Sequence, residues 1–107
     1  LENQRLKVTG CIQNSLTGRY DRVWWLADPA GASLAVVCSY DLMDAYGAGH
    51  PGAKLSKELK KGDFVTCYGT LNWSRSRKGG DWQLTPASPD DFAPATEQAW
   101  RADNAGY

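Results

Sequence analysis

The stretch KGDFVTCYGTL at residues 61–71, followed by NWSRSRKGGDWQL at residues 72–84, decides the fold of this chain. The pattern predicts a strand over 64–71, a basic loop with a tryptophan at its base, and a second strand over 82–85. In the first strand Val65, Cys67 and Leu71 alternate with more polar positions, as a half-buried strand requires. The strands can build a small barrel, while the loop offers positive charge and an aromatic ring to a ligand.

Three further strands precede this hairpin. The patterns predict them over residues 6–13, 22–27 and 33–38. Gly10, in the middle of the first strand, predicts a bulge or a tight bend. Residues 28–31 predict a turn between the second and third strands. Residues 40–45 and 54–60 predict short helices, so the expected order is three strands, a helical connection and two strands.

The 107 residues are enough for one domain with its own core. We expect the barrel over residues 1–87 and an acidic, Ala-rich tail over 88–107 that is partly ordered, with a helical turn around 97–101. Trp100 lies in this tail. It either packs back on the barrel or binds a partner.

The order of elements resembles the OB-fold, a five-stranded Greek-key barrel of the all-β class. The resemblance is carried by KVTGCI (7–12), VVC (36–38) and LKKGDFVTCYGTL (59–71). The last run is similar to the start of the fourth strand in single-stranded-DNA-binding proteins, anticodon-binding-like domains and primosomal accessory proteins. The tail from Ser88 lacks the linker and tip of the bacterial single-stranded-DNA-binding proteins, which favours a plasmid, phage or accessory relative.

The resemblance implies oligonucleotide binding on the second and third strands and on the loops after the first and fourth. The candidate nucleic-acid-binding residues at these positions are Arg19, Tyr20, Arg22, Trp24, Trp25, Trp73, Arg75, Arg77 and Lys78. Stacking a base on an aromatic side chain contributes about 1–3 kcal/mol and tolerates any sequence. Basic side chains beside the rings would neutralise phosphates and make the affinity salt-dependent.

The tryptophans need separate interpretations. Trp24 and Trp25 are adjacent and must point to opposite faces of a strand. We expect Trp24 to pack with Leu26 and Trp25 to be more exposed, and the alternative is that both are buried. Trp73 is either a stacking platform or a lid on the end of the barrel, and Trp82 is expected in the core.

The formal net charge is zero, but the charges are segregated. Residues 54–78 carry a net charge of +5, whereas residues 28–46 and 89–107 each carry −3. A local positive field can steer a polyanion even when the total charge is zero. The group Lys54, Lys57, Lys60 and Lys61 either extends this field or forms an ordinary solvated helix face.

The residues argue against catalysis and against a metal or cofactor. Cys11, Cys38 and Cys67 lie in apolar runs without a CxxC pair, and we interpret them as buried free thiols of a cytoplasmic protein. His50 is alone in a Gly-rich segment, which is a weak metal or catalytic signal. The pair Asp90-Asp91 fits helix capping after Pro89 better than acid–base chemistry.

These observations predict a non-catalytic domain that binds single-stranded nucleic acid, DNA rather than RNA, and that is accessory to DNA replication, repair or transfer. The alternative is an OB-fold protein-interaction or assembly module, a homo-oligomer or a recruiter of partners through the tail. A third hypothesis is an extracytoplasmic domain for a small polar ligand, since a start at Leu1 is compatible with a removed segment. The free thiols weigh against it.

Overall fold

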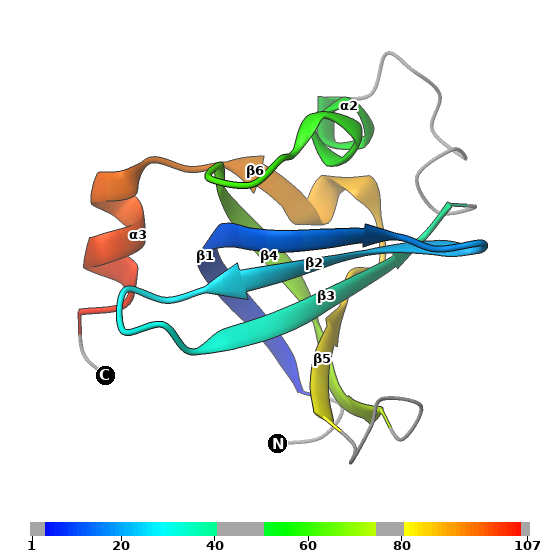
Figure 1. Ribbon diagram of the computed structural model, residues 1–107, viewed down its shortest axis with the longest axis horizontal. Helices are drawn as coiled ribbons and strands as arrows, with labels where there is room; N and C mark the ends of the chain where they lie inside the picture. Colours follow the sequence, from blue (N-terminus) through cyan, green and yellow to red (C-terminus); the bar gives the residue numbers. More distant parts are fainter. Residues whose placement is uncertain (1–3, 41–50, 75–80, 106–107) are drawn as a thin grey trace.

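The computed structural model of the protein describes residues 4–40, 51–74 and 81–105, and Figure 1 shows a curved sheet that closes on itself with helices at its periphery. The strands are β1 (Arg5–Thr17), β2 (Asp21–Ala27), β3 (Ser33–Ser39), β4 (Phe64–Ser74), β5 (Asp81–Thr85) and β6 (Phe92–Pro94). The helices are α2 (Pro51–Glu58), the 3-10 turn η1 (Pro89–Asp91) and α3 (Glu97–Asp103). Among the described residues, no helix is long and apolar enough to cross a membrane.

The first five strands form the predicted barrel. β1 pairs antiparallel with β4 through Arg5–Cys11 and with β2 through Cys11–Thr17. β3 continues the sheet from β2, and β5 pairs antiparallel with β4. A short parallel pairing of β3 with β5 closes the barrel. The expectation of five strands with a helical connection after the third is confirmed.

β1 serves two partners because it bends sharply in its middle (Figure 1). Gly10 lies next to Cys11, where β1 changes partner, and a Cβ atom on Gly10 would come within 2.5 Å of the Cβ of Leu26. Only glycine therefore allows β1 to cross so close to β2. The bulge that the sequence suggested at Gly10 lies three residues later, at Gln13.

The core lies inside the barrel and consists of Ile12, Trp24, Leu26, Val36, Cys38, Leu59, Val65, Cys67, Leu84 and Phe92. Trp24 is the largest fully buried side chain, and its ring packs edge-on against Phe92 with 5.6 Å between ring centroids. Phe92 belongs to β6, and Leu59 follows α2. The segments outside the five strands thus supply part of the core, where each large apolar side chain contributes about 1.5–3 kcal/mol.

The main differences from the predicted elements lie in four places, the first being β4, which continues past the predicted residue 71 to Ser74. β1 continues to Thr17, so the polar run after Gln13 is strand and not loop. α2 begins at Pro51, because proline suits the first turn of a helix, and ends before the predicted residue 60. β6 was not predicted. The predicted helix over 40–45 lies almost entirely outside the described residues.

The segment after Thr85 packs on the barrel. β6 pairs with β4, placing Ala93 opposite Thr66. In α3 the indole Nε1 of Trp100 donates a hydrogen bond of 2.8 Å to the carbonyl of Ala27, and its ring lies 5.2 Å from that of Phe64. The predicted helical turn is confirmed within α3, and of the two interpretations of Trp100 the structure shows the packed one. The domain boundary at residue 87 stays a prediction.

Candidate nucleic-acid interface

The two adjacent tryptophans of β2 lie on opposite faces of the sheet, as strand geometry requires. Trp24 is 1% exposed and lies in the core beside Leu26, so its ring cannot stack on a base. Trp25 is half-buried and lies on the outer face. The expectation for Trp24 and Trp25 is therefore confirmed, and Trp24 leaves the set of candidate binding residues.

The outer face of β1, β2 and β3 carries two rows of side chains set by the strand register. One row runs from Leu16 through Val23 to Val37, and the next from Asn14 through Trp25 to Ala35. Leu16 is 58% exposed at the open end of the first row. The face is thus apolar in its middle and includes the half-buried ring of Trp25.

An open hollow of about 500 Å³ lies beside Trp25. We call it the Trp25 hollow; its lining residues are Gln13, Asn14, Trp25 and Lys61. Lys61 reaches this place because its turn is tied to β1. The amide of Gly62 donates to the carbonyl of Ile12 (2.9 Å), and the amide of Ile12 donates to the carbonyl of Asp63 (2.8 Å).

This turn also needs glycine, because Gly62 has φ +95°. Among the described residues, Lys61 has no ion pair. The sequence pointed to Lys61 only as one of four lysines and did not indicate Gln13 or Asn14. The missing signal was the position of the turn, which lies next to β1 only in the folded barrel.

The turn between β1 and β2 holds Arg19 and Tyr20. Tyr20 is 73% exposed, and the guanidinium of Arg19 lies over its ring at 5.4 Å from the centroid. Tyr40 holds the turn in place: its amide donates to the carbonyl of Tyr20 (3.1 Å) and its hydroxyl donates to the carbonyl of Gly18 (3.0 Å). The turn thus presents one cation and one aromatic ring to solvent, and their role in binding stays a prediction.

Arg22 does not face the same way as Arg19 and Tyr20. The prediction that Arg22 contacts a phosphate group is therefore corrected. Its guanidinium donates to the carbonyls of Lys57 (3.3 Å) and Leu59 (3.0 Å), at the end of α2. It also lies 5.0 Å from the centre of the Trp24 ring. Arg22 points inward because it shares the side of β2 on which Trp24 and Leu26 lie. Its charge stabilises the C-terminal end of a helix, where carbonyl groups concentrate negative potential.

Trp73 lies near the end of β4 and is 41% exposed. Its ring packs edge-on against that of Trp82, which lies opposite it on β5, at 5.3 Å. Trp73 thus has both an exposed ring surface, which a stacking platform needs, and a contact at the end of the barrel, which a lid would make. Its role in stacking stays a prediction. The other candidates of this region, Arg75, Arg77 and Lys78, lie outside the described residues.

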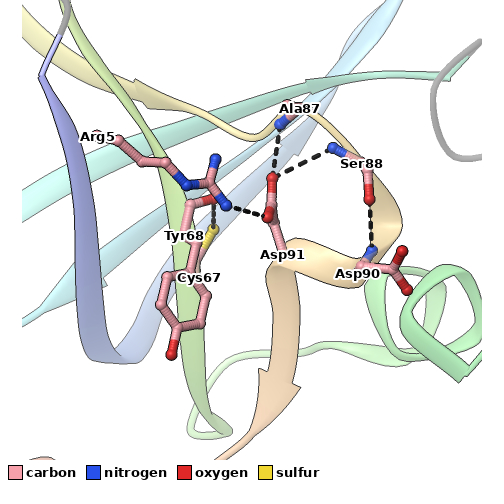
Figure 2. Close-up of polar contacts among 7 residues, drawn as sticks. All are labelled: Arg5, Cys67, Tyr68, Ala87, Ser88, Asp90 and Asp91. Carbon is pink, nitrogen blue, oxygen red and sulfur yellow. Dashed lines mark hydrogen bonds and ion pairs between the residues drawn. The ribbon is translucent and has the colours of Figure 1, made fainter.

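A second polar cluster, around Asp91, is structural. Figure 2 shows the Asp91 carboxylate between the guanidinium of Arg5 (2.6 Å) and the backbone amides of Ala87 (2.8 Å) and Ser88 (3.2 Å). Arg5 also lies over the ring of Tyr68, and the bond to Asp91 raises the pKa of its guanidinium. The carboxylate is buried and fully engaged in fixing η1, which agrees with the capping role expected for this pair.

The three cysteines are free thiols that differ in burial. Cys38 and Cys67 are buried, as expected, and burial raises the pKa of Cys38 to about 11 and that of Cys67 further. Cys11 is half-buried, which corrects the expectation for that residue. Within the described ranges, no three His, Cys, Asp or Glu side chains form a group that could hold a metal ion.

Comparisons with known proteins were made at the level of sequence and of structure. No protein-family model matches the chain, and no curated protein matches it by sequence. Its structure is similar to a chain of the S. pombe Stn1-Ten1 complex, with a TM-score of 0.68 and 20% identity over 94% of this chain and 66% of that one.

Two further solved structures are similar. One is a chain of a replication protein A heterotrimer bound to ssDNA, with a TM-score of 0.60 and 14% identity over 89% of this chain and 60% of that one. The other is the OBody NL8 bound to hen egg-white lysozyme, with a TM-score of 0.66 and 18% identity over 91% of this chain and 99% of that one. The chain thus spans slightly less than two thirds of the Stn1-Ten1 and replication protein A chains. Strand order, barrel closure and these likenesses identify it as an OB-fold domain.

Proposed function

We propose that this domain binds single-stranded nucleic acid, DNA rather than RNA, across the outer face of β1, β2 and β3. One observation carries the proposal: the half-buried ring of Trp25 lies on this face beside an open hollow that is also lined by Lys61, which forms no ion pair with another described residue. An aromatic ring beside a cation is the combination that binds a base and its phosphate without regard to sequence.

The hairpin turn extends the proposed path. Tyr20 offers a second exposed ring, and Arg19 offers a second cation beside it. Trp73 is a third candidate platform, and the basic residues Arg75, Arg77 and Lys78 follow it in the sequence. A polyanion that follows these groups would meet positive charge at several points while the total charge of the protein stays at zero.

The role that we propose is non-catalytic, cytoplasmic and accessory to DNA replication, repair or transfer. Two observations support it. The replication protein A structure that this chain resembles is bound to ssDNA. The ionisable groups of the described residues are engaged in structural contacts, such as the buried carboxylate of Asp91, or are dispersed over the surface.

The proposal can be tested by fluorescence titration with an oligothymidine at several salt concentrations. Trp25→Ala should weaken binding about 5- to 150-fold, the equivalent of about 1–3 kcal/mol for one stacked base. Trp25→Phe is the matched control, because it keeps an aromatic ring at the same position and should retain most of the binding. Arg19→Gln and Lys61→Gln should each reduce the salt slope by about 0.7. Absence of binding at low salt would refute the proposal.

A second candidate function is protein binding, favoured by the exposed Leu16 at the open end of the outer face. The OBody that this chain resembles is bound to a protein, hen egg-white lysozyme. Leu16→Lys, followed by light scattering, tests self-association without disturbing the core. Deleting residues 88–107 is unsuitable for this purpose, because it would remove Phe92 from the core.

A further inference from the structure

The bulge in β1 gives the Trp25 hollow hydrogen-bonding side chains in addition to the ring of Trp25. Ile12 pairs with Leu26 and Asn14 pairs with Trp25, so Gln13 is an extra residue with no partner on β2. In a regular strand, consecutive side chains point to opposite faces. A bulge breaks this alternation and redirects a side chain, often at a functional site. Here two consecutive carboxamides, those of Gln13 and Asn14, line the same hollow.

The hollow is rich in hydrogen-bond donors. The Oδ1 of Asn14 accepts a hydrogen bond from the amide of Ser15 (2.9 Å), so the Nδ2 group is the part of this side chain left for a ligand. Lys61 adds an ammonium group with three donors, and Gln13 adds a carboxamide with a donor and an acceptor. No carboxylate is among the described residues that line the hollow. A matching base should therefore present acceptors.

Among the four bases, guanine presents two adjacent acceptors, N7 and O6, on its Hoogsteen edge. Adenine and cytosine place an amino donor on the corresponding edge, and thymine has one acceptor, O4, beside its methyl group. In a single strand this edge is open to protein side chains while the ring stacks.

We infer that the Trp25 hollow is a subsite that prefers guanine, with the ring stacked on Trp25 and N7 and O6 facing the donors of Asn14, Gln13 and Lys61. This inference rests on the proposed function and deepens it. The hollow therefore gives an otherwise sequence-tolerant domain one position of base selectivity.

The test uses the wild-type chain and oligothymidines with one variable central base, measured by fluorescence anisotropy. The oligonucleotide with a central dG should bind about five- to tenfold more tightly than the one with dT. This ratio is near the lower end of the discrimination that a bidentate contact to a base gives, because the hollow is open to solvent. Inosine keeps N7 and O6 and should bind like dG. The 7-deaza analogue keeps the ring but lacks N7 and should lose most of the preference.

The outcomes separate the two proposals. Equal binding of all four bases, or equal binding of dG and its 7-deaza analogue, overturns the inference and leaves the proposed function standing. Absence of binding to every oligonucleotide overturns both.

Gln13→Ala and Asn14→Ala should reduce the dG preference below twofold with the dT affinity nearly unchanged. Gln98→Ala, on the exposed side of α3, is the matched control, and retained preference in both variants contradicts the assignment.

Discussion

Arg22 offers the sharpest test of how this barrel uses its charges. Replacing it by methionine keeps an unbranched stem against the Trp24 ring but removes the donors to the carbonyls of Lys57 and Leu59. A hydrogen bond from a charged group contributes about 1.5–3 kcal/mol when it is shielded from water, and less when it is exposed. The bond to Leu59 is partly buried and that to Lys57 is exposed. The expected loss is therefore about 2 kcal/mol.

The assay is urea unfolding followed by circular dichroism, with thermal unfolding as a second measurement. A loss of about 2 kcal/mol should lower the melting temperature by roughly 10 °C in a domain of this size. Arg22→Met should leave the salt slope of oligonucleotide binding unchanged, because Arg22 faces inward. Arg19→Met is the matched control and should do the reverse: full stability and a smaller slope. An Arg22→Met protein of wild-type stability with a reduced slope would refute this reasoning.

Three other substitutions and conditions test the fold. Gly10→Ala should cost about 1–3 kcal/mol in urea unfolding, because its Cβ would collide with that of Leu26; an undisturbed protein would contradict the close crossing. Asp91→Ala should cost about 2 kcal/mol by leaving two backbone amides without their acceptor, whereas Gln98→Ala, at an exposed position, should change stability by less than about 0.5 kcal/mol. Burial raises the pKa of Cys38 to about 11 above its ordinary value near 9, so the thiol stabilises the fold fully below pH 9 and progressively less as the pH rises towards 11. Unfolding in urea from pH 8 to 10.5 should show this decline, with a smaller slope in Cys38→Ser.

The five strands of the barrel were predictable because each has a local signature. Alternation of apolar residues marked β1 and β4, aromatic and β-branched residues marked β2, and an apolar run marked β3. β6 had no such signature: three residues with a terminal proline carry too little periodicity to predict a strand. Its place depends on β4 offering a free edge at Thr66, which exists only in the folded barrel.

The candidate site likewise has parts that could be predicted from the sequence and parts that could not. The separation of Trp24 from Trp25 followed from strand alternation. Arg22 was misassigned because proximity in sequence to that turn suggested a surface role, whereas its strand parity directs it to the core side. Lys61 and Asn14 line one hollow because a turn and a bulge bring segments together that are distant in the sequence. Neither the position of the turn nor the bulge can be predicted from the local sequence.

The closure of the barrel has a consequence for its motions. β3 joins β5 only through Ala35 opposite Gln83 and Val36 opposite Leu84, whereas β3 joins β2 along its whole length. Hydrogen bonds at this seam should break and re-form more often than those elsewhere in the barrel, and its amides should exchange with deuterium first. Ala35 also lies beside Trp25 on the outer face. A strand of nucleic acid bound over Trp25 should therefore slow deuterium exchange of the amides where β3 pairs with β5. The exchange rate of these amides would then show whether the outer face is occupied.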